Sequence, residues 1–299
     1  RFTEAFPTVQ DMASAPEEQV LKLWQGLGYY SRARNLHATA KQVAFDMGGQ
    51  FPNSYAGLLK LKGVGDYTAA AIASISYGEA VPVVDGNVYR VLSRVFGIDT
   101  DISSGGAKKQ FVELAASLMP KGQASEFNQA MMEFGALQCV PKSPDCGICI
   151  FNKECVAFTA GVVHKLPVKL KKTKVTNRYF NYLVIKDAKG KSIVRKRTGK
   201  GIWHNLYEFP LLETDSQIPV KRMTEMIGKF EGLGFVPEKI MLVNEVPVIH
   251  KLSHQHLNIR FWEVIADKNL TEAADIEALK AFPFPVVIHN FIENHWSND

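Results

Sequence analysis

Cysteine is scarce in this chain, and its placement is uneven. The 299 residues contain four cysteines, and all of them lie between Cys139 and Cys155. A small disulfide-dense scaffold is therefore excluded, because it would need far more cysteine. Thiols grouped this closely favour ligands to a common centre over a disulfide framework or scattered buried thiols.

Long apolar runs and a strong charge excess are also missing. No apolar stretch approaches the roughly eighteen residues of a membrane span, so we expect no membrane association. The 35 basic and 30 acidic side chains leave a net charge of +5, which permits a polyanionic partner without requiring one. An apolar share of 46% and a charged share of 22% are ordinary for a folded protein and exclude a disordered or collagenous chain.

The residues before Cys155 carry the periodicity of helices. Apolar side chains recur at the i, i+3, i+4, i+7 spacing of one helical face in three segments. These segments are Val20, Leu23, Trp24 and Leu27; Val88, Val91, Leu92 and Val95; and Phe127, Ala130, Met131, Phe134 and Leu137. Glycine and proline separate them, and no long β-branched alternation intervenes. We therefore predict an all-α domain over residues 1–157.

The pattern changes after the cysteines. Residues 165–174 hold five lysines and no acidic side chain, which is typical of a solvated linker or of a strap that contacts phosphate. We predict an interdomain linker at 158–176 and an α+β domain at 177–299. Alternation and amphipathic spacing predict strands over 179–185, 192–194, 240–243 and 257–265, and helices over 219–231 and 286–296.

The four cysteines, Cys139, Cys146, Cys149 and Cys155, are separated by six, two and five residues. Thiolates suit zinc or an iron–sulfur centre. A zinc ribbon usually has two separated C-x-x-C pairs, and only one is present here. The two-cluster ferredoxin run with its terminal Cys-Pro is absent as well. An iron–sulfur centre is favoured, with zinc and then free thiols as the alternatives.

A short glycine motif, Gly63-Val64-Gly65, follows Leu61 and precedes the helix-forming residues 69–72. Glycines allow a tight turn and a close approach to a ligand, and the amides that open the next helix attract an anion. The structural alternative is an ordinary helix C-cap. Its position between two helices favours a helix–hairpin–helix, which holds a DNA phosphate without reading the base.

Asp85 follows an apolar stretch, and Asn87 opens the next helical segment. Both residue types are favoured as helix N-caps, and this is the simplest role for them. A carboxylate beside a reacting sugar can also stabilise oxocarbenium charge or trap it covalently. Capping and catalysis can coexist in one residue.

Together these motifs resemble those of the adenine DNA glycosylases of the MutY type, in the endonuclease III superfamily. Three further segments carry the resemblance: GLGYYSRARNL at 26–36, FNQAMM at 127–132 and GIWHNLYEFP at 201–210. It implies a helix–hairpin–helix glycosylase domain with a [4Fe–4S] loop, followed by a MutT-like (Nudix-fold) domain. It also implies a monomer of the bacterial cytosol, associated with the nucleoid, that hydrolyses the N-glycosidic bond of adenine opposite 8-oxoguanine or guanine in duplex DNA.

The resemblance assigns roles to several residues. Asp85 matches the catalytic aspartate, with Asn87 beside it, and the four cysteines would hold the cluster. Tyr67 stands where endonuclease III-type enzymes carry a lysine that attacks the sugar. Because a phenol cannot form that imine, the resemblance implies base removal without efficient strand cleavage, with Tyr67 positioning the catalytic carboxylates.

Chemistry on a base in duplex DNA requires that the base be flipped out of the stack. In the family, a tyrosine at the position of Tyr29 stacks beside the oxidised guanine. The structural alternative is that Tyr29 and Tyr30 close a helix core. Arg32 and Arg34 meet either phosphate or solvent. The residues expected to contact DNA in this part of the chain are Leu27, Tyr29, Arg32, Gly63, Val64 and Gly65.

The C-terminal half lacks the Arg-Glu-x-x-Glu-Glu-x-Gly helix that Nudix hydrolases use to bind a divalent metal. We therefore expect a recognition module and not a second hydrolase. Leu252, Ser253 and His254 match a Phe-Ser-His loop in relatives, with leucine in place of phenylalanine. The resemblance implies that Ser253 and His254 contact the lesion and that Ser253 bonds the N7–H of 8-oxoguanine.

In the family, the acid that protonates the departing adenine is a glutamate on an early helix. No glutamate before Gly26 matches that motif. We expect that this acid precedes Arg1, that the chain is N-terminally incomplete, and that it is inactive alone. Two alternatives stay open: a catalytically inactive module that binds DNA lesions, and an electron-transfer or zinc protein of another class.

Overall fold

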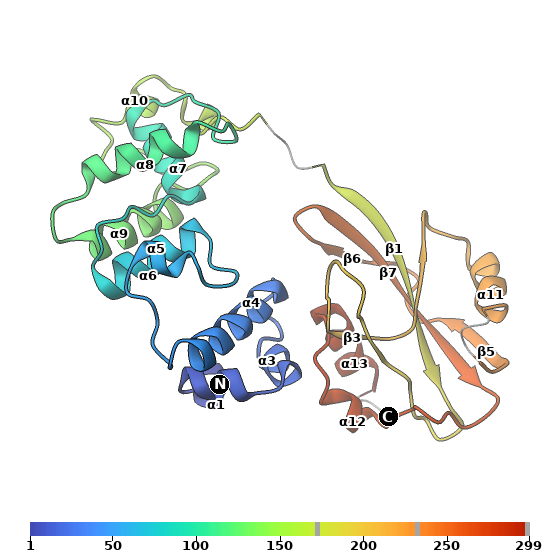
Figure 1. The fold of residues 1–299 in the computed structure, drawn as a ribbon. Helices are drawn as coiled ribbons and strands as arrows, with labels where there is room; N and C mark the ends of the chain where they lie inside the picture. The colour runs from blue at the N-terminus through green and yellow to red at the C-terminus, as the bar shows by residue number, and fades with distance from the viewer. Residues whose placement is uncertain (171–173, 231–233, 297–299) are drawn as a thin grey trace. The chain divides into compact units, whose positions relative to one another are not determined.

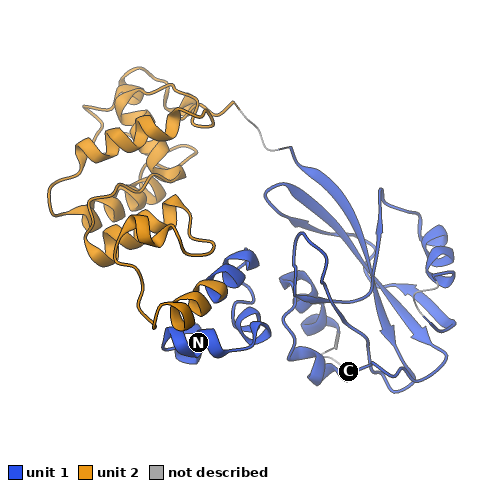
Figure 2. Ribbon diagram, viewed as in Figure 1, with its two compact units in different colours: residues 1–37, 173–299 blue, residues 38–172 orange. Residues whose placement is uncertain are grey.

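A computed structural model describes residues 1–170, 174–230 and 234–296 (Figure 1). Contacts between residues divide the chain into two compact units, which are described separately below. Unit 1 comprises residues 1–37 and 173–299, and unit 2 comprises residues 38–172 (Figure 2). This division differs from the sequence pattern in one respect, because residues 1–37 belong with the C-terminal part. The domain boundaries 1–157, 158–176 and 177–299 stay predictions.

Unit 2 is helical, as predicted, and its described residues contain no strand. Its elements are the end of α4 (Tyr30–Lys41), the π-helix η1 (Gln42–Asp46), α5 (Tyr55–Leu58), α6 (Asp66–Tyr77), α7 (Gly86–Phe96), α8 (Ala107–Leu118), α9 (Ala124–Leu137), α10 (Val156–Thr159) and η2 (Val163–Lys165). The periodic segments at Val88–Val95 and Phe127–Leu137 form α7 and α9. Across the described residues of the whole chain, no helix is long and apolar enough to cross a bilayer.

The core of unit 2 lies between α7 and α8. Val88 and Leu92 of α7 are buried against Phe111 of α8, and Phe127 and Met131 of α9 pack on the same cluster. These residues recur at helical spacing, so one face of each helix is covered. Burying a side chain the size of Phe111 stabilises the fold by about 2–3 kcal/mol.

The lysine-rich segment is only partly a linker. Leu166 is buried with Cys155 and Ala157, and the amide of Ile102 donates to the carbonyl of Val168 at 3.0 Å. Leu166 and Val168 therefore pack on the cysteine loop, whereas Lys165 and Lys169 of the same stretch are exposed. The lysines at 171 and 172 lie outside the described residues.

Unit 1 contains a mixed five-stranded sheet, which agrees with the predicted α+β class. The strands of the chain are β1 (Thr176–Lys186), β2 (Arg195–Lys196), β3 (Tyr207–Glu208), β4 (Leu211–Thr214), β5 (Pro237–Leu242), β6 (Val248–Lys251) and β7 (Gln255–Ala266). β1 and β7 run parallel at the centre, β4 pairs with the other edge of β1, and β5 and β6 pair antiparallel with β7. β2 and β3 form a separate pair.

The strand predicted at 192–194 is wrong. Ser192 makes only isolated bridges, to Lys186 and Ala274, and regular pairing begins at β2. The carboxylate of Asp187 accepts from the amides of Lys189 and Lys191, both at 2.9 Å, and forms the turn after β1. Ser192 then exchanges backbone hydrogen bonds with Ala274, both at 2.9 Å, so the segment does not continue as a strand along β1.

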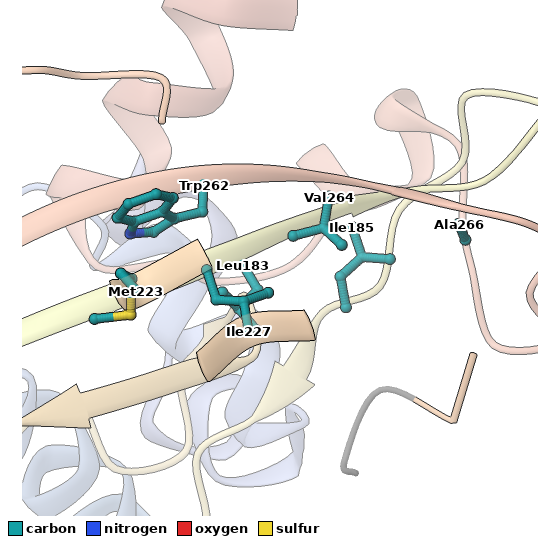
Figure 3. Packing of buried hydrophobic residues seen from close by; sticks show 7 residues of the cluster. All are labelled: Leu183, Ile185, Met223, Ile227, Trp262, Val264 and Ala266. Carbon is teal, nitrogen blue, oxygen red and sulfur yellow. The ribbon is translucent and has the colours of Figure 1, made fainter. Parts of the chain in front are cut away.

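The sheet is buried on both faces. On one face, side chains of β1 and β7 pack against Met223 and Ile227 of α11 (Val220–Gly228) (Figure 3). On the other, the ring of Phe261 stacks on that of Phe291 of α13 (Val286–Trp296), with centroids 3.8 Å apart. Both helices correspond to predicted segments, 219–231 and 286–296. The shorter α12 (Ile276–Lys280) precedes α13.

The N-terminal segment of unit 1 forms α1 (Phe2–Ala5), α2 (Val9–Ser14), α3 (Glu17–Leu23) and the start of α4. The predicted helical face reaching Leu27 is wrong, because α3 ends at Leu23. Gly26 and Gly28 have φ of +93° and +68°, which a continuing helix cannot accommodate. The indole of Trp24 donates to the carbonyl of Gly28 at 2.9 Å and fixes this turn.

Candidate functional site

The glycine motif forms the turn between α5 and α6 of unit 2. Gly63 has φ of +76°, a left-handed conformation that favours glycine, and Gly65 is the N-cap of α6. Thr39 donates to the carbonyl of Lys62 at 2.6 Å and holds the turn. Both glycines are exposed, and a Cβ at Gly65 would meet nothing within 4 Å. The amides at this helix start are therefore open to an anion.

Asp85 is the N-cap of α7, as the simpler interpretation predicts. Its Oδ1 accepts from the amides of Asn87 at 2.8 Å and Val88 at 2.9 Å. Its Oδ2 accepts from the side-chain amide of Asn87 at 3.1 Å. Three donors thus fix the direction of the carboxylate, which remains partly exposed. The cap does not exclude catalysis, since Oδ2 keeps acceptor capacity.

Arg90, which sequence reasoning missed, links this carboxylate site to the cysteine loop. Its guanidinium donates to Oδ1 of Asn87 at 2.9 Å, to the carbonyl of Gly135 at 2.6 Å and to the carbonyl of Cys139 at 2.7 Å. A Cβ at Gly135 would lie 2.7 Å from that of Asn87. The close approach of α7 and α9 therefore depends on glycine at this position.

The four cysteines line one cavity of unit 2, and none forms a disulfide. Burial, together with the three neighbouring cysteines, raises the pKa of the Cys146 thiol. Among the described residues, no group of three or more His, Cys, Asp or Glu side chains could hold a single metal ion. Four free thiols around one cavity are a donor set that fits a thiolate-bound metal centre.

Arg94, a second missed residue, holds the cysteine loop to α7. It is 2% exposed, and Nη1 lies 3.4 Å from the sulfur of Cys139. The thiol of Cys155 lies 3.3 Å from the carbonyl of Arg94. The Arg94 guanidinium also donates to the carbonyls of Val140, Pro141, Val163 and Leu166. Arginines on a helix usually face solvent, so no local pattern identifies Arg90 or Arg94 as buried residues that hold the cysteine loop.

Tyr67 lies in the first turn of α6 and is half exposed. Its hydroxyl lies 3.8 Å from the sulfur of Met132 on α9. Within the described residues, no hydrogen bond joins Tyr67 to Asp85 or Asn87. The structure therefore brings Asp85 and Asn87 together but does not tie Tyr67 to them.

Unit 1 contains a cleft of about 600 Å³. It brings together four of the predicted DNA contacts, Leu27, Tyr29, Ser253 and His254, from two distant parts of the sequence. Leu27 is 62% exposed and Tyr29 is 67% exposed. Ser253 and His254 are exposed as well. The cleft therefore offers an aromatic ring, an apolar side chain and hydrogen-bonding groups to a ligand.

Tyr29 and Tyr30 have different roles. Tyr29 has φ of +46°, in the left-handed region, and its ring faces solvent with the guanidinium carbon of Arg32 4.6 Å from its centroid. Tyr30 is buried and donates to the carbonyl of Phe284 at 3.1 Å. The helix-core alternative therefore holds for Tyr30 and is wrong for Tyr29.

Arg34 makes a hydrogen bond within the protein, a role that the two sequence alternatives of phosphate and solvent do not include. Its Nη1 donates to the carbonyl of His204 at 2.9 Å, and burial lowers its pKa while Glu17 opposes that shift. Trp203, beside that carbonyl, lines the cleft with its ring centroid 5.5 Å from that of His250. Burial lowers the pKa of His250, which favours its neutral form at pH 7.

Similarity to known proteins identifies the family of this chain. The HhH-GPD superfamily of base excision DNA repair proteins matches residues 1–117, and a NUDIX domain matches residues 181–294. An adenine DNA glycosylase of Buchnera aphidicola subsp. Baizongia pistaciae is 32% identical over 266 residues, which cover 89% of this chain and 72% of the relative. The chain belongs to the adenine DNA glycosylase family.

Further members of the adenine DNA glycosylase family match shorter parts of the chain. The protein of Buchnera aphidicola subsp. Schizaphis graminum is 35% identical over 71% of this chain, and the match spans 61% of that relative. The Homo sapiens protein is 48% identical over 52% of this chain and 29% of its own length.

Membership confirms the family that the motifs predicted and the order of a helical glycosylase domain before a Nudix domain. It excludes an electron-transfer or zinc protein of another class. Members of the HhH-GPD superfamily commonly carry a [4Fe–4S] cluster.

Proposed function

We propose that this protein removes adenine from duplex DNA where adenine faces 8-oxoguanine or guanine. The observation that carries the proposal is the cleft of unit 1, where Leu27, Tyr29, Ser253 and His254 meet in a member of the adenine DNA glycosylase family. Its volume of about 600 Å³ lies in the range of ligand-binding clefts. We also propose that the protein acts as a monomer, the state that the resemblance to the family implies.

The cleft suits the base opposite the adenine. The exposed ring of Tyr29 can stack on an extrahelical or partly unstacked purine. The hydroxyl of Ser253 can accept the N7–H proton of 8-oxoguanine, whereas N7 of guanine is an acceptor. His254 adds a second polar group at the same wall. These contacts would favour 8-oxoguanine over guanine.

Asp85 is the proposed catalytic carboxylate. Its orientation by Asn87 and the start of α7 suits a group that stabilises oxocarbenium charge on the sugar or traps it covalently. Tyr67 cannot form a Schiff base, so the proposal includes no strand cleavage through that position. In this scheme Tyr67 positions the catalytic carboxylates, and its hydroxyl lies 3.8 Å from the sulfur of Met132 on α9. The exposed turn at Gly63, with Val64 and Gly65, holds a DNA phosphate through backbone amides.

We also propose that Cys139, Cys146, Cys149 and Cys155 hold a [4Fe–4S] cluster. Four free thiols around one cavity support a thiolate-bound centre, and the single C-x-x-C pair among them favours the cluster over a zinc ribbon. When bound, the cluster would tie the loop together as a structural centre. Arg90 and Arg94 connect that loop to α7, so the loop and the carboxylate site share one support.

The test is adenine release from duplexes with adenine opposite 8-oxoguanine, using the protein as its complete reading frame encodes it. Asp85→Asn should lower the single-turnover rate by about a hundredfold or more, because the carboxylate charge is lost. Asparagine caps helices as well as aspartate does, so the fold should be kept. Lesion binding should also be kept.

Equal release by wild type and Asp85→Asn would refute the catalytic assignment. A wild-type protein that binds the lesion duplex without releasing adenine would instead identify an inactive lesion-binding module.

A further inference from the structure

The backbone around Trp203, on one wall of the cleft, is unusual. Trp203 and Asn205 have φ of +59° and +64°, in the left-handed region that side chains rarely adopt. Such conformations persist only where surrounding contacts over-determine them. Here the amide of Asn205 donates to the carbonyl of Arg197 at 2.8 Å, and Nε of Arg197 donates to that of Ile202 at 3.1 Å.

Two side chains from the N-terminal helices also hold this loop. Arg34 of α4 donates to the carbonyl of His204 at 2.9 Å, and Glu17 of α3 accepts from the side-chain amide of Asn205 at 2.5 Å. Arg34 itself lines the cleft. Its bond therefore ties the helix that follows Tyr29 to the wall formed by the 199–205 loop.

Trp203 connects this loop to the segment that carries the predicted lesion contacts. It is 8% exposed, and its ring lies against His250, with centroids 5.5 Å apart and planes at 56°. His250 lies on β6, and residues 250–255, including Ser253, line the same cleft. A shift of the loop would therefore displace Trp203 against the strand that leads to Ser253.

We propose that Arg34 is a positioning residue for recognition of the base opposite the adenine. Arg34 holds the carbonyl of His204 and thereby fixes the neighbouring Trp203. The position of Trp203 in turn sets the distance between Tyr29 and Ser253, which line the cleft. Arg34 touches neither base nor phosphate in this role. The inference rests on the proposed function, which assigns the cleft to an 8-oxopurine.

The test compares Kd for two duplexes, with adenine opposite 8-oxoguanine or opposite guanine, using the full chain. Arg34→Met keeps an extended apolar side chain but cannot donate to His204. We expect the ratio of the two Kd values to fall by about tenfold, the usual effect of losing one charged hydrogen bond. Affinity for the guanine duplex should change by less than about threefold. Arg34→Lys, which keeps a donor, should restore part of the preference.

Lys22→Met is the matched control. Lys22 also ties the N-terminal helices to the C-terminal part, by donating to the carbonyls of Lys280 at 2.5 Å and Phe282 at 3.1 Å. Neither acceptor lines the cleft. Loss of the same charge at this position should leave the Kd ratio unchanged.

An unchanged ratio in Arg34→Met, or an equal fall in Lys22→Met, would overturn the positioning role. If Arg34→Met does not fold, comparison of Arg34→Lys with Lys22→Arg decides the same question. A wild-type chain that binds both duplexes equally would contradict the proposed function. Failure of the proposed function is thereby distinguished from failure of the positioning role of Arg34.

Discussion

Two neighbouring tyrosines of this protein differ in burial and in their contacts. Tyr29 is exposed in a left-handed conformation, whereas its neighbour Tyr30 is buried and bonded to the carbonyl of Phe284. The deciding contact lies far along the chain, so no local pattern separates the two. The same applies to Arg34, whose acceptor is the carbonyl of His204.

Ser253 gives the prediction at this scale. Ser253→Ala removes the acceptor for the N7–H of 8-oxoguanine, so the preference for 8-oxoguanine over guanine should fall by about tenfold. Release of adenine opposite guanine should be unaffected. Single-turnover rates on the two duplexes measure both quantities. Ser216→Ala, at an exposed serine outside the cleft, is the control, and an unchanged preference in Ser253→Ala would contradict the assignment.

Motifs predicted several of these positions because their spacing is local. Asp85 caps α7 as its type and position suggest, and the four cysteines meet around one cavity. Arg90 was missed although it bonds Asn87, Gly135 and Cys139, because its partners come from separate elements. The roles of the site residues in catalysis and DNA binding stay predictions.

At the scale of elements, hydrophobic periodicity predicts helices with one buried face and strands whose apolar residues are buried without interruption. α7 and α9 were predicted because one face of each is covered, and β1 and β7 because their apolar runs are buried at the sheet centre. The error at 192–194 has a tertiary cause, since the backbone of Ser192 bonds that of Ala274, which lies far along the chain. The sequence pattern also misplaces the end of α3, which lies at Leu23. The left-handed conformations of Gly26 and Gly28 prevent the helix from continuing to Leu27.

The packing of α7 on α9 yields a prediction about Gly135. A Cβ there would lie 2.7 Å from the Cβ of Asn87 and 3.1 Å from its carbonyl oxygen. Gly135→Ala must therefore push the helices apart, at a cost of about 1–3 kcal/mol in the free energy of unfolding. It should also slow adenine release, because Asn87 orients Asp85. Chemical denaturation and single-turnover rates measure the two effects.

Gly228 is the matched control for Gly135. It ends α11, and a Cβ there would meet only the side chain of Ile240 at 3.9 Å, which is ordinary contact. Gly228→Ala should stabilise the protein by about 0.5–1 kcal/mol, because alanine restricts the unfolded chain. Equal destabilisation by both substitutions would contradict the steric argument.

At the scale of the whole molecule, the sequence predicted two parts but not the membership of residues 1–37. Those residues join unit 1 through bonds such as Lys22 to the carbonyl of Lys280 and Tyr30 to that of Phe284. Contacts between residues so far apart in the sequence do not affect the local hydrophobic periodicity, so the sequence pattern cannot predict them. One consequence is that all four tryptophans lie in unit 1, whereas all four cysteines lie in unit 2.

This partition allows the two units to be observed separately. Removal of the proposed iron–sulfur cluster by oxidation and chelation should loosen unit 2, because metal binding contributes folding free energy. Amide hydrogen exchange should become at least about tenfold faster in α7 and α9 and stay unchanged in β1 and β7. The tryptophan-detected unfolding midpoint should move by less than about 2 °C, since that signal comes from unit 1. Protein carried through the same treatment with its iron restored is the control. Equal loss of protection in both units would show that they unfold as one, and protection retained in α7 and α9 would show that the cysteine centre does not support the carboxylate site.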